Sequence, residues 1–189
     1  MKKFFKWFFI SFSVFLILLF TVTAFLNDKY SVERSVSINA PKDSVFTYIA
    51  NLNTWHKWNP WFLADAKMKN KITITDSLTG SSWQWESKLL GNGILRFEKV
   101  YPTDSIYAVM EFTAPKHTVI QEYWTFKTKG DSTIVFWEHV GPLDYPLGRI
   151  FGLWSNSMLG PTFEQGLNAI KSQLENKNKT PQSSGEKTK

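Results

Sequence analysis

The side chains that could transfer protons are three histidines, His56, His117 and His139, and a set of glutamates in segments rich in strand-forming residues. None of the histidines has a metal-binding spacing such as H-E-x-x-H. Glu138 and His139 are neighbours in a predicted strand, so their side chains point to opposite faces and cannot pair with each other. His139 could instead face the interior beside Trp137 and act as an acid or a base.

Five glutamates lie in predicted strands: Glu86, Glu98, Glu111, Glu122 and Glu138. Most are expected on a solvated face. One buried carboxylate would favour catalysis, but the sequence does not single one out. The chain has no cysteine, which excludes disulfides, thiolate catalysis and cysteine-ligated zinc. It also has no glycine-rich phosphate loop and no nucleophile elbow. We therefore predict no catalytic residue, metal or cofactor, and favour binding over catalysis.

The aromatic residues are the most informative part of the composition, with 9 Trp, 6 Tyr and 16 Phe. The stretch NTWHKWNPW places Trp55, Trp58 and Trp61 close together, just before and after Pro60. Trp55 and Trp58 suit a core corner, whereas Trp61 suits a cavity mouth. In the predicted strands, Trp83 shares a face with Trp85, Trp124 with Phe126, and Val135 with Trp137. Aromatic residues line ligand pockets, but a packed core uses the same residues, so both interpretations stay open.

The elements that would position these residues follow from periodicity. We predict a strand at 32–38 with Arg34 out of phase, a helix after Pro41 over 42–52, and six strands between 70 and 140. Since Ile134 and Phe136 make the other face of the last strand apolar too, its inner face stays undecided. A helical pattern then resumes, with Pro161 either starting a second helix or kinking one long helix. This order predicts an α+β fold, a curved antiparallel sheet with a long C-terminal helix.

The first helical stripe after the strands contains Leu147, Ile150, Phe151, Trp154 and Met158. It has three interpretations: ordinary packing, a lid over a pocket entrance made compliant by nearby glycines, or a surface that lies on a membrane.

The N-terminus carries a segment suited to a membrane. Residues 7–26 are uncharged and almost wholly apolar, long enough to cross the hydrocarbon layer as a helix. The preceding lysines, Lys2, Lys3 and Lys6, predict a cytoplasmic N-terminus and an extracytoplasmic domain. A cleaved signal peptide is the alternative, but Thr23-Ala24-Phe25 is a poor cleavage site. We predict an anchor at 1–29, a domain at 30–175 and a disordered tail at 176–189. The net charge of +6 gathers at the two ends, so no nucleic-acid surface is expected.

Several short motifs together resemble the START-like, or SRPBCC, superfamily, also called the polyketide cyclase/dehydrase and lipid-transport superfamily. They are Ala40-Pro41, Val45-Phe46, the Trp55-x-x-Trp58-x-Pro60 bend, the strand GDSTIVFWEH and the helix MLGPTFEQGLNAIKSQLE. The resemblance covers residues 31–175. It implies a helix-grip fold, in which the C-terminal helix rests on the sheet and an apolar cavity between them takes a hydrophobic small molecule or lipid.

From this resemblance and the aromatic pattern we predict the ligand-binding residues to be Trp58, Trp61, Trp83, Trp85, Phe112, Trp124, Trp137, His139, Trp154, Met158 and Phe163. Three functions follow. The first is a membrane-anchored domain that binds or carries a hydrophobic molecule. The second is a cyclase- or hydrolase-type enzyme that uses the same cavity. The third is a non-catalytic module for an envelope protein partner, which would have a filled core and an exposed apolar patch.

Overall fold

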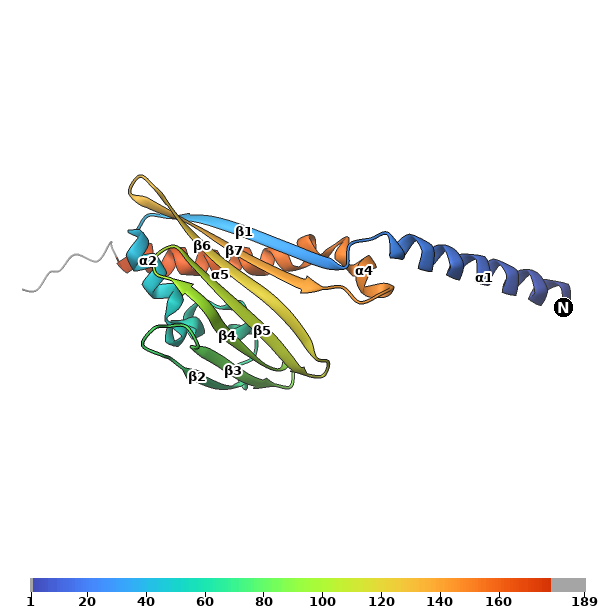
Figure 1. The fold of residues 1–189 in the computed structure, drawn as a ribbon, viewed down its shortest axis with the longest axis horizontal. Coiled ribbons are helices and arrows are strands. Elements are labelled where there is room, and N and C mark those ends of the chain that lie inside the picture. The colour runs from blue at the N-terminus through green and yellow to red at the C-terminus, as the bar shows by residue number, and fades with distance from the viewer. Residues whose placement is uncertain (1, 178–189) are drawn as a thin grey trace, which may run out of the picture.

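The computed structural model describes residues 2–177, and their main element is one seven-stranded antiparallel sheet in the order β1-β7-β6-β5-β4-β3-β2 (Figure 1). The elements along the chain are α1 (Lys2–Ala24), β1 (Lys29–Ile38), α2 (Lys42–Ala50), η1 (Leu52–Lys57), α3 (Pro60–Ala64), β2 (Lys69–Thr73), β3 (Ser82–Ser87), β4 (Gly91–Tyr101), β5 (Ser105–Ala114), β6 (Thr118–Lys129), β7 (Ser132–Pro142), α4 (Leu147–Gly152) and α5 (Ser155–Lys177). The predicted α+β fold, with its curved sheet and long C-terminal helix, is confirmed. The predicted disordered tail begins inside α5, and residues 178–189 lie outside the described residues.

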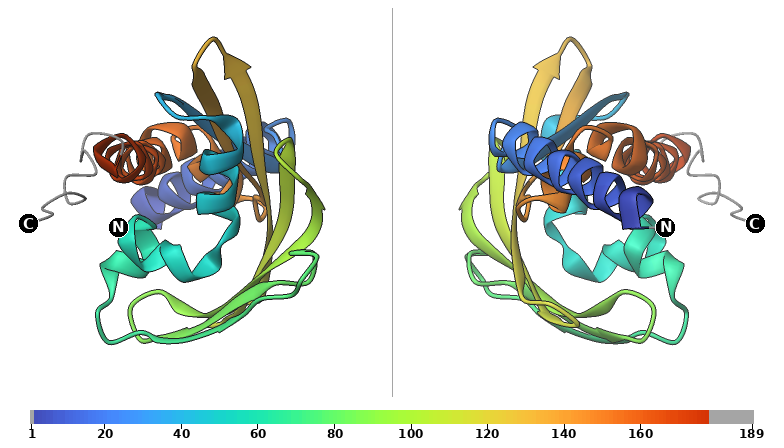
Figure 2. Two further views of the ribbon diagram at one scale, coloured as in Figure 1. Left: turned by 90° about the vertical axis from the view of Figure 1, so that its left-hand side faces the viewer. Right: turned by 90° about the vertical axis from the view of Figure 1, so that its right-hand side faces the viewer.

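The sheet curves around α2, η1 and α3, and α5 packs along β1 (Figure 2). Aromatic side chains fill most of the space inside the curve. Phe46 of α2 lies edge-on to Phe126 of β6 with ring centroids 5.4 Å apart, and Trp55 packs on Trp58 at 5.1 Å. Edge-to-face and offset ring pairs of this kind stabilise a core beyond the apolar area that they bury.

Burial identifies the inner face of β7, which the sequence left undecided. Val135, Trp137 and His139 are buried, whereas Ile134 and Phe136 lie half-buried on the outer face. Arg34 does not break the pattern of β1. It points to α5, where its guanidinium donates to Glu164 Oε1 at 2.7 Å and lies against Gly160. A Cβ on Gly160 would stand 1.9 Å from Arg34 Nη2, so a larger residue there would displace the guanidinium.

The C-terminal helical region breaks at residues 153–154 and not at Pro161. The backbone N–H groups of Leu153 and Trp154 bond to carbonyls three residues earlier, a tighter turn that separates α4 from α5. Pro161 lies inside α5, where a proline removes one backbone hydrogen bond.

The pairing of the strands brings one end of the sheet next to α1. Lys29 pairs with Pro142, Phe112 with Thr118, and Ser87 with Gly91. The start of β1, the end of β7 and the loops β3–β4 and β5–β6 therefore lie at the end of the sheet from which α1 emerges (Figure 1).

Helix α1 is long and apolar enough to cross a membrane, with a mean hydropathy of 2.3 over its best window in Lys3–Ala24 and only 6% of that window buried. Its C-terminal carbonyls are held by the segment around α4. Arg149 Nη1 donates to the carbonyls of Thr23 at 3.1 Å and Ala24 at 2.9 Å, and the Tyr145 hydroxyl donates to Phe20 O at 2.8 Å. A cation at a helix C-terminus also interacts favourably with the helix dipole.

Candidate functional site

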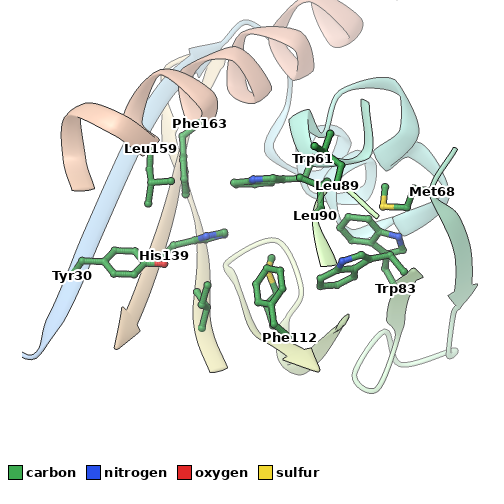
Figure 3. A pocket seen from close by; sticks show the side chains of 13 residues that line it. Tyr30, Trp61, Met68, Trp83, Leu89, Leu90, Phe112, His139, Leu159 and Phe163 are labelled. Atoms are coloured by element: carbon green, nitrogen blue, oxygen red, sulfur yellow. The ribbon is translucent and has the colours of Figure 1, made fainter. Parts of the chain in front are cut away.

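A cavity of about 380 Å³ lies between the concave face of the sheet and the N-terminal half of α5 (Figure 3). Its size is in the range typical of small-molecule sites. The lining residues come from five strands, two helices and two connecting segments: Tyr30, Trp61, Met68, Trp83, Trp85, Leu89, Leu90, Met110, Phe112, Ile120, His139, Leu159 and Phe163. Apart from indole N–H groups, the polar side chains in this set are Tyr30 and His139.

Trp61 is positioned by the turn that the Trp-rich stretch encodes. The Asn59 side chain caps α3 by accepting from the backbone N–H of Trp61 at 3.0 Å and of Phe62 at 3.2 Å, and Pro60 occupies the first helical turn. The Trp61 ring then stacks on the His139 imidazole, with centroids 5.3 Å apart and planes 11° from parallel. The last tryptophan of the stretch therefore forms a cavity wall.

Two aromatic side chains lie flat across glycines on neighbouring strands. Trp85 is opposite Gly93 in the β3–β4 pair, and Tyr30 is opposite Gly141 in the β1–β7 pair. A Cβ at Gly93 would stand 2.4 Å from the Trp85 ring, and one at Gly141 would stand 2.5 Å from the Tyr30 ring. Since real Cβ atoms do not approach so closely, glycine at these positions lets both rings lie along the wall of the cavity.

The β3–β4 loop is tied to the end of α3 by Ser87. The Ser87 hydroxyl donates to Asp65 Oδ2 at 2.7 Å and accepts from the backbone N–H of Leu89 at 3.1 Å and of Leu90 at 2.9 Å. These bonds hold Leu89 and Leu90 at the edge of the cavity. The hydrogen bond from Ser87, aided by the backbone N–H of Lys67, holds the pKa of Asp65 below its ordinary value.

A buried acid–base pair lies at the end of the cavity formed by β1, β7 and β6. Glu122 of β6 is opposite His139 of β7, and Glu122 Oε2 lies 2.7 Å from His139 Nε2. The Trp124 indole donates to the other carboxylate oxygen at 2.6 Å. Glu122 is 1% exposed and His139 3%. The imidazole faces the cavity and its orientation is held from behind by a carboxylate, an arrangement that can accept or return a proton.

Tyr30 lies at the same end, and its hydroxyl points toward His139 in Figure 3. Burial of the phenol raises the pKa of Tyr30 to about 12, because a buried phenolate would lose its hydration. Tyr30 therefore stays protonated at neutral pH.

Six of the residues predicted from the sequence line this cavity: Trp61, Trp83, Trp85, Phe112, His139 and Phe163. Three others lie behind the wall with no exposed surface, because Trp58, Trp124 and Trp137 pack on one another with centroids 4.5 to 5.8 Å apart. Two lie outside the cavity, since Trp154 is 55% exposed and Met158 60%.

Sequence reasoning missed seven of the lining residues: Tyr30, Met68, Leu89, Leu90, Met110, Ile120 and Leu159. It also did not single out Glu122 among the five strand glutamates. One pattern could have identified it, since Glu122 is in phase with Trp124 and Phe126 and so belongs to their face of β6. Within residues 2–177, no group of three or more His, Asp or Glu side chains is arranged to hold a metal ion.

Solved structures of similar fold support this description. The chain matches the Mll3558 protein from Rhizobium loti with a TM-score of 0.58 and 15% identity, covering 77% of this chain and 97% of that one. It matches the di-domain ARO/CYC StfQ from the steffimycin biosynthetic pathway with a TM-score of 0.62 and 12% identity, covering 80% of this chain and 52% of StfQ.

DynU16 from the dynemicin biosynthetic locus gives a TM-score of 0.55 at 17% identity over 79% of this chain, which spans 48% of DynU16. Identities this low show a shared fold and nothing further. No curated protein matches the sequence. The model for polyketide cyclase/dehydrase and lipid transport matches residues 29–175, a range that includes the whole sheet and nearly all of α5, so the chain belongs to that family.

Proposed function

We propose that this protein binds or carries a hydrophobic small molecule or lipid in the cavity while α1 holds the domain at a membrane. The observation that carries the proposal is the position of the cavity. Tyr30, His139, Phe112 and the β3–β4 loop that line it lie at the end of the sheet from which α1 emerges. A bilayer crossed by α1 would therefore lie next to the cavity, and an apolar ligand would have only a short path through water.

The contacts of α1 favour a retained anchor over a cleaved signal peptide. Arg149 and Tyr145 donate to carbonyls in its last turns, and cleavage after Ala24 would remove these partners. Lys3 and Lys6 precede the apolar segment. By the positive-inside tendency they stay in the cytoplasm, so the sheet domain works outside it.

Exposed apolar residues lie on α4, which contacts α1, and at the start of α5. This patch comprises Leu147, Phe151, Leu153, Trp154 and Met158, each more than a third exposed. Contiguous apolar patches are uncommon on soluble monomers and mark contact surfaces, and tryptophan is enriched at membrane interfaces. Because Met158 is next to Leu159, a cavity residue, this patch would place the cavity edge on the bilayer.

The central test is native mass spectrometry of the full chain released from detergent, with organic extraction of bound molecules. Two neighbouring substitutions on β6 make a matched pair: Ile120→Trp fills the cavity, and Val119→Trp lies on the outer face, where Val119 is 41% exposed. We expect a discrete apolar ligand on the wild type and on Val119→Trp, and its loss from Ile120→Trp. A clean apo mass for the wild type, with no uptake from a lipid panel, would overturn the proposal.

The membrane contact is tested separately with nanodiscs that contain brominated lipids, which quench tryptophan fluorescence at short range. The emission lost in Trp154→Phe, relative to the wild type, isolates Trp154. We expect that difference signal to be quenched by lipids brominated near the headgroup. An unquenched Trp154 would place the patch in water, and so make it available to a protein partner instead.

The Glu122–His139 pair favours a second candidate function, an enzyme of the cyclase or hydrolase type that acts on the ligand in the same cavity. His139 would be the general base or acid and Glu122 would orient it. Incubating the ligand extracted in the first experiment with the wild type and with His139→Gln separates the two functions. A product mass formed only by the wild type would establish catalysis. A ligand that neither protein changes would support the carrier function.

A further inference from the structure

The cavity has an apolar body and a single polar end, and this division indicates the class of ligand. Resting on the proposed function, we infer that the ligand is a neutral, mainly apolar molecule with one oxygen function, a hydroxyl, phenol or carbonyl, held between the Tyr30 hydroxyl and the His139 imidazole. The cavity residues are otherwise hydrocarbon, thioether and indole side chains.

The apolar part limits the size and shape of the ligand. At roughly 30 Å³ for each water-sized group, a cavity of about 380 Å³ has room for about a dozen non-hydrogen atoms. The walls at the far end are the flat faces of Trp83 and Trp85, whose centroids are 4.8 Å apart, and the Phe112 ring, edge-on to Trp85 at 5.4 Å. A compact ring system or a short, folded chain fits such a space.

At the other end, two polar groups face the same space. Among residues 2–177 no hydrogen bond occupies the Tyr30 hydroxyl, and the hydrogen bond of His139 uses Nε2, which leaves Nδ1. Both residues line the cavity, and Figure 3 shows the Tyr30 hydroxyl pointing toward the imidazole. Because the rest of the cavity wall is apolar, a ligand oxygen that pairs with these two groups gains affinity.

The pair behind the imidazole determines what that oxygen can do. Glu122 already accepts from the Trp124 indole and pairs with His139 Nε2. A neutral imidazole that donates from Nε2 accepts at Nδ1, and an imidazolium donates there. The Tyr30 hydroxyl donates or accepts. A ligand hydroxyl can therefore form hydrogen bonds here whether His139 is neutral or protonated. A ligand carbonyl can accept from the Tyr30 hydroxyl or from a protonated His139.

Charged head groups do not fit this end. Among the residues that the structure describes, no lysine or arginine lines the cavity, and the buried Glu122 carboxylate lies 2.7 Å behind the imidazole. An anionic ligand would lose its hydration, and even a protonated His139 is already balanced by that carboxylate, so no cation is left for the ligand. Fatty-acid carboxylates and phosphate head groups are therefore excluded from the polar end.

The test uses the full chain in nanodiscs and three probes with the same two-ring body: 2-naphthol, 2-methylnaphthalene and 2-naphthoate. Binding is measured by titration against the wild type, Tyr30→Phe and Tyr107→Phe. Tyr107 is a matched control, because it lies on the outer face stacked on Tyr123, with centroids 5.1 Å apart. Since all proteins are studied in the same lipid, partition of each probe into the bilayer cancels when the variants are compared.

We expect the wild type to prefer 2-naphthol to both other probes. Tyr30→Phe should weaken the binding of 2-naphthol about tenfold, the change in affinity that the loss of one hydrogen bond of about 1.4 kcal/mol gives. It should leave 2-methylnaphthalene unchanged, and Tyr107→Phe should alter neither. Equal affinities for 2-naphthol and 2-methylnaphthalene, an equal loss of both in Tyr30→Phe, or tightest binding of 2-naphthoate would overturn this inference and leave the binding function intact. Failure of all three probes to bind would overturn both.

Discussion

Replacing Gly141 by alanine tests whether the Tyr30 ring lies across β7 and so presents its hydroxyl to the cavity. The added Cβ would stand 2.5 Å from Tyr30 Cε1, 2.7 Å from Cζ and 2.8 Å from the hydroxyl oxygen. Carbon atoms in contact are usually about 3.5 to 4.0 Å apart, so the ring must retreat by about 1 Å. Overpacking of this kind costs about 1–3 kcal/mol in the free energy of unfolding.

The cost should disappear when the ring is absent. Gly141 does not have a positive φ, so alanine is permitted there. In a Tyr30→Ala background, Gly141→Ala should therefore stabilise the fold by about 0.5–1 kcal/mol, since glycine inside a strand loses more chain entropy than alanine. The coupling energy between the two positions is then about 1.5–4 kcal/mol.

Urea denaturation of the four proteins in the same micelles, followed by tryptophan fluorescence, measures this coupling. Titration of the same four proteins with 2-naphthol shows whether displacement of the Tyr30 ring also weakens binding. Additive effects of the two substitutions, within about 0.5 kcal/mol, would refute the placement of Tyr30 on Gly141 and with it the polar end of the cavity.

Three further predictions concern groups around the cavity. Because burial raises the pKa of Tyr30 from 10.0 to about 12, the folded protein binds the phenol proton more tightly than the unfolded chain, and this contribution to the free energy of unfolding should be lost as pH rises through about 10 to 12. Tyr30→Phe should lose less stability between pH 9 and pH 11.5 in urea titrations. An identical loss in both proteins would contradict the burial of the Tyr30 phenol. Glu122→Met leaves His139 unpaired in the core and should cost about 3–5 kcal/mol, of which adding His139→Leu should recover a substantial part; a double variant no more stable than Glu122→Met would argue against the buried pair. Ser87→Ala should raise the pKa of Asp65 toward its ordinary value in a carbon-detected NMR titration, because the largest cause of its lowering is removed; an unchanged pKa would show that the Ser87 bond does not form in solution.

The sequence predicted the elements well and their faces only in part. Alternation located all six strands of the meander, because strands with one buried face repeat every second residue. It did not decide the inner face of β7, because both faces carry apolar residues, Ile134 on one and Trp137 on the other. Only the packing of the neighbouring strands and α5 determines which face is buried.

The candidate site was harder to predict because a cavity wall and a packed core use the same residues. Trp58 and Trp61 are three positions apart with similar neighbours, yet Trp58 is fully buried among other rings and Trp61 borders the cavity. The difference lies in contacts distant in sequence. Likewise, the partnership of Glu122 with His139 depends on the register between β6 and β7, which no local pattern reveals.

The cavity exists at one end of the sheet because the chain fills the two ends differently. Away from α1, Phe46 packs edge-on to Phe126 inside the curve, and Phe97, fully buried, packs on Trp55. Near α1, the side chains of Trp85 and Tyr30 lie flat across glycines, so their rings line a wall instead of crossing the interior. Flat rings make this end wide, and the cross-strand register places a tyrosine and a histidine there together. Gly141, which makes room for the Tyr30 ring, therefore also lets the hydroxyl that would recognise a ligand lie at the end of the domain nearest α1.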